Sequence, residues 1–198
     1  MKKTFLLILS LIAFSYASKA QTRFGIKGGV NFANTTNSIG GISVSGSSIT
    51  SFHVGGVLES RLSERVFIQP NLLFSQKGTS IEISGLGSGK DTYSYLELPV
   101  NVLYEVADYF TLGGGPYLGY ALSAKTTSGG VSQDIEFGAG GMKRLDYGLN
   151  FTAGYEVIDG LTISANYSLG LANIADINNV TIKNNVIGIS VTKFFGAK

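Results

Sequence analysis

The sequence contains no cysteine and no tryptophan, and its 198 residues include one histidine and three prolines. Without cysteine the chain can form no disulfide, carry no lipid on an N-terminal cysteine and use no thiolate as a nucleophile. With His53 as the single histidine, it also lacks the cluster of imidazole and thiolate ligands that zinc sites use. The sequence therefore predicts neither a bound metal nor a cofactor.

Charge is also sparse, because only 14% of the residues are charged and the formal net charge is +2. A surface with so little positive charge does not attract nucleic acid. The glycine runs at 113–115 and 138–141 precede no helix and no Gly-Lys-Ser or Gly-Lys-Thr, so they are not phosphate-binding loops. No catalytic motif remains, and we expect no enzymatic activity.

Residues 1–20 have the pattern of a secretory signal peptide. Lys2 and Lys3 precede an apolar run over 4–14, and Ser18-Lys19-Ala20 provides the small residues of a cleavage site. The apolar run is too short to cross a bilayer as a helix, which takes about 20 residues. We expect an exported protein whose single domain spans residues 21–198.

The rest of the chain alternates apolar and polar residues in eight segments, and none shows the 3.6-residue period of a helix. The predicted strands cover 23–34, 50–61, 65–77, 92–106, 109–124, 143–157, 161–172 and 184–195. Long connections alternate with short ones, the long ones at 35–49, 78–91, 125–142 and 173–183. Outer-membrane barrels have long extracellular loops and short periplasmic turns. The pattern predicts an all-β fold, an eight-stranded antiparallel up-and-down transmembrane β-barrel.

Aromatic residues on the apolar side of these strands gather near the strand ends, as in the two aromatic girdles of a membrane barrel. The girdle predicted at the periplasmic interface consists of Phe24, Tyr104, Phe110, Tyr155 and Phe195. The girdle predicted at the outer interface consists of Phe32, Phe52, Phe74, Tyr120 and Tyr147. Phe151 and Tyr167 fall between the two. A soluble carrier of the lipocalin type remains an alternative, since alternation alone does not say which side faces inward.

The polar side of the strands predicts a filled interior, because eight strands enclose only enough room for side chains. Buried charges need partners, and we expect a structural network of ion pairs there. Its members are Arg23, Lys27, Glu59, Arg61, Glu97, Glu105, Asp146 and Glu156. Lys27 is placed to pair with Glu97 or Asp146. The alternative is a functional carboxylate pair or proton relay.

Pro70, Pro99 and Pro116 each remove a hydrogen-bond donor from a predicted strand, so we expect a bulge or a missing hydrogen bond at each.

His53 suggests an enzymatic function as one further alternative. Lipid-A-modifying barrel enzymes use a histidine near the outer leaflet, and we expect His53 near the outer end, beside hydroxyl groups of the loops. A lone histidine facing a polar interior is more often a hydrogen-bonding filler.

Two stretches resemble a known family: Phe24-Gly25-Ile26-Lys27-Gly28-Gly29-Val30-Asn31 and Tyr95-Leu96-Glu97-Leu98-Pro99-Val100. They are similar to the outer-membrane β-barrel domain family of Bacteroidetes, whose members are called porin-family or PorT-like proteins. The resemblance implies an eight-stranded barrel inserted by the barrel-assembly machinery, with Phe194-Phe195 as the insertion signal. It implies no shared activity and no catalytic residues.

Taken together, these features predict a non-enzymatic protein of the Gram-negative outer membrane with a structural, adhesive or interaction role. The expected partners are outer-membrane lipid, lipopolysaccharide, the barrel-assembly machinery and an envelope or secretion-machinery protein. A narrow diffusion pore is the alternative, and a lipid-A-modifying enzyme is a third function to test.

Overall fold

The computed structural model describes residues 22–40, 42–83 and 87–196. The predicted signal peptide, residues 1–20, lies outside these ranges. The strands are β1 (Thr22–Ile39), β2 (Ile42–Ser45), β3 (Ile49–Arg61), β4 (Val66–Ile83), β5 (Gly87–Ala107), β6 (Phe110–Ser128), β7 (Val131–Asp134), β8 (Leu145–Ile158), β9 (Leu161–Gly170) and β10 (Val180–Phe195). Within the described residues, no helix has the length and apolar character needed to cross a membrane.

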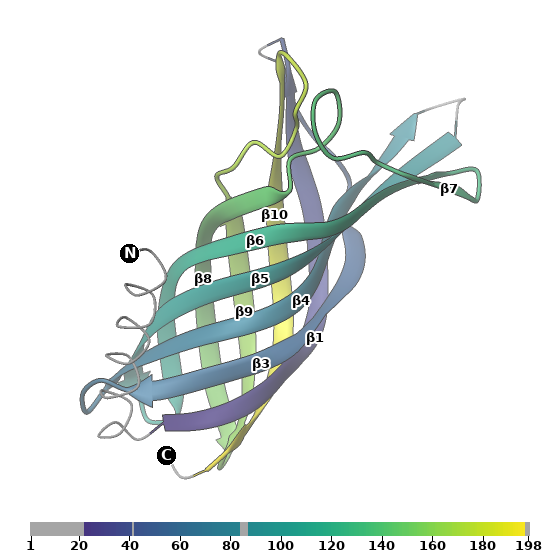
Figure 1. The fold of residues 1–198 in the computed structure, drawn as a ribbon. Coiled ribbons are helices and arrows are strands. Elements are labelled where there is room, and N and C mark those ends of the chain that lie inside the picture. Colours follow the sequence, from purple (N-terminus) through teal and green to yellow (C-terminus); the bar gives the residue numbers. More distant parts are fainter. Residues whose placement is uncertain (1–21, 41, 84–86, 197–198) are drawn as a thin grey trace, which may run out of the picture.

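Eight of these strands close into a barrel. Each pairs antiparallel with the next in the order β1, β3, β4, β5, β6, β8, β9 and β10. The ring is closed by β10 and β1, whose pairing runs from Phe24↔Phe195 to Ile39↔Val180. Figure 1 shows the strands inclined to the barrel axis, as closure of a sheet requires. The predicted antiparallel barrel of eight strands is confirmed.

The two ends of the barrel differ. At one end, the turn end, short connections at 62–65, 108–109 and 159–160 join neighbouring strands, and β1 starts where β10 ends. At the other, the loop end, the longer connections follow β7 and β9. Gly160 has a φ of 73° in its two-residue turn, a conformation that glycine adopts without strain.

The apolar side of the eight barrel strands faces outward. Along β8, for example, Leu145, Tyr147 and Leu149 are exposed, whereas Asp146 and Asn150, which alternate with them, are buried. The soluble-carrier alternative required the apolar side inside and the polar side in water. The structure has the opposite arrangement, which is that of a barrel surrounded by lipid.

The aromatic residues assigned to the two girdles also face outward, and the strand register sorts them by height. Phe24 and Phe195 are direct partners at the turn end, where their rings stack 6.5 Å apart. Nearer the loop end, the rings of Phe52 and Phe74 lie 5.8 Å apart. The other members lie on the same outer surface: Tyr104, Phe110, Tyr155, Phe32, Tyr120 and Tyr147.

The predicted connections are wrong at the loop end, where strands continue into the expected loops. The segment predicted as a loop at 78–91 is mostly the ends of β4 and β5, and 125–142 contains the end of β6 and all of β7. Both faces of a strand are wet above the membrane, so alternation of apolar and polar residues stops there while the backbone pairing goes on. Figure 1 shows these strand ends leaning away from one side of the barrel.

The three prolines interrupt the ladder without changing its register. Pairing of β3 with β4 stops after Val57↔Asn71 and resumes at Ser60↔Ile68 in the same register, beside Pro70. The pairings of β4 with β5 and of β5 with β6 show the same gap beside Pro99 and Pro116. The expected missing hydrogen bonds therefore occur, and no bulge accompanies them. The amide of Asn71 compensates in part, because it donates to the carbonyls of Gln69 and Pro99.

Candidate functional site: the filled lumen

At the turn end of the lumen, one guanidinium joins two carboxylates from distant parts of the chain. Arg23 Nε donates to Glu59 Oε1 at 2.8 Å, and its terminal nitrogens donate to both oxygens of Glu156 at 2.9 and 3.2 Å. Gln69 donates to the other oxygen of Glu59, and the ring of Phe194 lies 4.1 Å from the guanidinium carbon. Bidentate pairs of this kind are among the stronger hydrogen bonds in proteins. They tie β1 to β3 and β8 across the interior.

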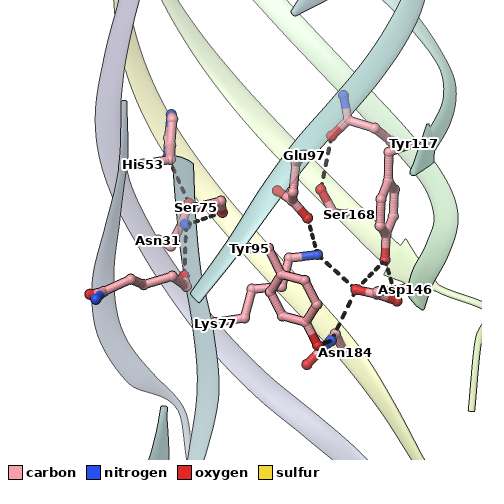
Figure 2. A network of polar contacts seen from close by, with 12 residues as sticks. Asn31, His53, Ser75, Lys77, Tyr95, Glu97, Tyr117, Asp146, Ser168 and Asn184 are labelled. Atoms are coloured by element: carbon pink, nitrogen blue, oxygen red, sulfur yellow. Dashed lines mark hydrogen bonds and ion pairs between the residues drawn. The ribbon is translucent and has the colours of Figure 1, made fainter. Parts of the chain in front are cut away.

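A second network lies nearer the loop end and is centred on Lys77, which sequence analysis did not single out (Figure 2). Its ammonium forms ion pairs with Glu97 and with Asp146, the latter at 3.1 Å. Asp146 also accepts hydrogen bonds from Tyr117 and Asn184, and the aromatic ring of Tyr117 lies 4.4 Å from the ammonium. Lys77 and Asp146 are almost completely buried. These contacts hold β4, β5, β6, β8 and β10 together from within.

The prediction that Lys27 pairs with Glu97 or Asp146 is wrong. Its ammonium donates instead to the amide oxygen of Asn166 at 3.1 Å. Lys27 is buried, and no carboxylate of the described residues lies within ion-pair distance of it. Residues on the same side of two strands can differ in height once the barrel closes. Lys77, and not Lys27, lies within ion-pair distance of both carboxylates.

His53 lies next to Phe52 of the outer girdle, as expected, but its hydrogen-bond partners are strand residues and not hydroxyl groups of the loops. Its two ring nitrogens lie 2.8 Å from Asn31 Oδ1 and 2.8 Å from Ser190 Oγ, and its side chain is 6% exposed. Both partners belong to β1 and β10 and face the lumen, as Figure 2 shows for Asn31. His53 therefore contacts neither the loops nor the outer surface, and it joins the two strands that close the barrel.

The remaining members of the predicted network lie near the turn end. The Arg61 guanidinium lies 5.2 Å from the centre of the Phe67 ring. A carboxylate oxygen of Glu105 accepts a hydrogen bond from the backbone of Tyr109 at 3.2 Å, in the turn that follows β5. Within the described residues, no group of three histidine or acidic side chains is arranged to hold a metal ion.

An apolar cap closes the lumen at the loop end, and sequence analysis missed it. The buried residues of this cap come from the loop ends of β5 and β6 and from the connections that precede β8 and follow β9: Tyr93, Tyr95, Ala121, Ala124, Met142, Ala172 and Ile174. Backbone hydrogen bonds hold the connections in place, for example from the Lys143 nitrogen to the Ile174 oxygen at 2.7 Å.

The interior formed by the described residues contains two small cavities on opposite sides of its middle. One of about 30 Å³ lies beside Arg23 and Glu156, and one of about 40 Å³ lies among Lys27, His53 and Glu97. A single water molecule occupies roughly 10–15 Å³ on this measure. Each cavity can therefore hold a few water molecules but no solute of the size of a sugar or amino acid.

Comparison with known proteins agrees with this architecture. The family profile for the outer membrane protein beta-barrel domain matches residues 17–176. No curated protein sequence matches the chain. Among solved structures, Neisserial surface protein A is 13% identical, with a TM-score of 0.56 over 87% of this chain and 97% of that one.

Two further solved structures are similar at lower TM-scores. The attachment invasion locus protein Ail of Yersinia pestis is 18% identical, with a TM-score of 0.47 over 87% of this chain and 99% of that one. The outer membrane protein OprG of Pseudomonas aeruginosa is 14% identical, with a TM-score of 0.46 over 90% of this chain and 98% of that one.

Proposed function

This chain belongs to the outer membrane protein β-barrel domain family and lies in the bacterial outer membrane, and we propose that it is a closed, non-enzymatic barrel that presents its loop end to a partner. The turn end then faces the periplasm and the loop end faces the cell exterior, as in other barrels of this kind. The narrower resemblance to PorT-like proteins stays a prediction.

The filled lumen is the observation that carries this proposal. Arg23 and Lys77 each bridge two carboxylates across the interior, and the apolar cap around Met142 and Ile174 covers the mouth. A solute crossing the barrel would have to separate buried ion pairs, which costs several kcal/mol when a partner is lost. This disfavours the narrow diffusion pore.

The exposed strands at the loop end support an interaction role. The ends of β4, β5 and β6 continue beyond the lipid-facing surface, and β7 adds a fourth strand through pairs such as Ser128↔Val131. Every residue of β7 is exposed. Among the described residues β7 pairs with β6 alone, so its other edge offers backbone groups to a partner. We propose an envelope, secretion-machinery or cell-surface protein as that partner.

Conductance tests the closed barrel. Purified protein in planar bilayers should give no sustained current above that of the bare membrane, whereas a 16-stranded porin inserted in the same way provides the open-channel control. Large and sustained current through the folded protein would overturn the closed barrel and favour the pore.

Photo-crosslinking tests the interaction role. A crosslinking amino acid at Val131 in β7 should capture a protein in intact cells, and the same group at Leu62 in a turn at the other end is the matched control. If both positions capture only lipid or the same proteins, the loop end does not present a specific partner surface.

The lipid-A-modifying alternative depends on His53. Since its side chain is 6% exposed and bonded to Asn31 and Ser190 inside the barrel, it is poorly placed to reach a lipid substrate. We expect His53→Ala to leave the mass spectrum of lipid A unchanged in cells that express it. A shift in lipid A mass between wild type and this variant would restore the enzymatic alternative.

A further inference from the structure

An open hollow of about 510 Å³ lies on the outside of the barrel, apart from the lumen. Its lining comes from the lipid-facing surface of β6 and β8 and from the connection that precedes β8. The residues are Tyr120, Leu145, Phe137, Gly138, Met142, Lys143 and Arg144. The hollow combines an apolar floor with two cationic side chains.

The register places this hollow at the upper border of the lipid-facing surface. Tyr120 of the outer girdle pairs with Leu145, the first residue of β8, and both side chains are exposed on the outer surface. Lys143 and Arg144 come directly before Leu145. The cations therefore lie at the depth where acyl chains give way to headgroups, which is also where aromatic girdles lie.

Arg144 is held in position by contacts that leave its charge uncompensated. Its terminal nitrogen donates to the Ala121 oxygen at 3.0 Å, and its guanidinium carbon lies 3.8 Å from the centre of the Phe137 ring and 5.8 Å from that of Tyr120. Such cation–π contacts orient a guanidinium without neutralising it. A planar guanidinium is well matched to the oxygens of a phosphate.

Lys143 is exposed beside Arg144, and no carboxylate of the described residues lies within ion-pair distance of either side chain. Other exposed lysines either have a carboxylate partner or lie away from this upper lipid border. Lys125 pairs with Asp134 at 3.9 Å, and Lys90 lies six residues before the lipid-facing Leu96 on the strand ends that lean away from the barrel. Two unpaired cations at the lipid border call for an anionic headgroup.

We propose that this hollow binds a phosphate group of lipid A, the phosphorylated acyl-sugar lipid of the outer leaflet. Lys143 and Arg144 contact the phosphate, while Tyr120 and Leu145 contact the adjoining sugar and acyl chain. This inference depends on the location in the outer membrane and is independent of whether the loop end binds a partner protein.

A tryptophan introduced at Tyr120 can report binding, since the natural sequence contains no tryptophan. The protein carrying Tyr120→Trp is placed in phosphatidylcholine vesicles with increasing mole fractions of bisphosphorylated lipid A, and its emission is followed. Parallel titrations use lipid A from which both phosphates have been removed, and inorganic phosphate in the buffer. We expect saturable binding of the bisphosphorylated lipid alone.

In the same background, Lys143→Gln should raise the half-saturating mole fraction about fivefold, and Lys143→Gln/Arg144→Gln about 25-fold, because each cation near an anionic lipid headgroup contributes about one such factor. Lys143→Gln leaves the ring contacts of Arg144 in place, so it isolates the loss of charge. Lys90→Gln is the matched control and should leave binding unchanged. Heat-modifiable migration in electrophoresis checks that each variant is folded.

Three results would overturn the proposal. The first is equal binding of phosphate-free lipid A, and the second is unchanged binding by the folded double variant. The third is saturation by inorganic phosphate at millimolar concentration, which would make the hollow a site for free anions. None of these results bears on the conductance or crosslinking tests, so this inference can fail while the proposed function stands.

Discussion

Replacing Lys77 by methionine should destabilise the barrel strongly, whereas the same replacement at Lys27 should not. Both lysines are buried in the lumen, so the two variants replace the same side chain at two buried positions. Lys77 forms ion pairs with Glu97 and Asp146, whereas Lys27 donates to the neutral amide of Asn166. The two variants therefore remove the same charge from two different electrostatic surroundings.

The magnitude follows from what each replacement leaves behind. Lys77→Met leaves two carboxylates in the interior without their cation, and loss of one partner from a buried pair costs about 3–5 kcal/mol. Asp146 keeps its hydrogen bonds from Tyr117 and Asn184, which limits the cost at that side. Lys27→Met removes a buried charge that has no ionic partner among the described residues, so we expect a change within about 1 kcal/mol or a gain in stability.

The free energy of unfolding can be measured by urea titration in lipid vesicles, with the folded fraction read from heat-modifiable migration. The double variant Lys77→Met/Glu97→Gln should recover part of the loss, because it removes one of the two uncompensated carboxylates. Equal losses for Lys77→Met and Lys27→Met would refute the reasoning, since the ion pairs would then contribute nothing beyond packing.

Two other substitutions test the outer surface and the closure of the barrel. Leu98→Arg on the lipid-facing side should lower the free energy of unfolding by about 2–4 kcal/mol. The control Val131→Arg in β7 should change it by less than about 0.5 kcal/mol. Similar values at the two positions would place Leu98 outside the lipid. Gly29→Ala should reduce the yield of folded barrel, because its Cβ would lie 2.1 Å from the Ile189 oxygen of β10, whereas at Gly28 the nearest atom is 3.9 Å away. Urea titration and electrophoresis of Gly29→Ala and Gly28→Ala check this, and equal yields would contradict the close approach of β1 and β10.

Alternation along single strands predicted the strands, and the aromatic bands, the predicted export signal and the alternation of long and short connections were needed to favour a closed barrel with its apolar side in lipid. Parity places residues such as Leu149 and Asn150 on opposite sides of their strand, and in a membrane barrel one of these sides faces lipid and the other the lumen. Parity also places Lys77 in the lumen once it is carried three residues past Phe74. Lys77 was missed because it lies beyond the girdle residue Phe74, at the very end of the alternating segment.

Contacts between distant strands could not be predicted in the same way. Arg23 meets Glu156 across the barrel because of the stagger between strands, which sequence parity does not contain. The cap was missed for a different reason. Met142 and Ile174 stand alone among polar residues of predicted loops, and a single apolar residue there does not indicate that the connection folds inward.

The central claim is that the apolar side of the strands contacts acyl chains and the charged side is enclosed. Because the chain has no cysteine, single spin labels can be attached at Leu98, Leu149 and Ile189 in otherwise natural protein, with Val131 as the water-exposed reference. In lipid bilayers the first three labels should collide with dissolved oxygen and be shielded from a water-soluble nickel complex, and the label at Val131 should show the reverse. Nickel accessibility at Leu98, Leu149 and Ile189 equal to that at Val131 would contradict the account.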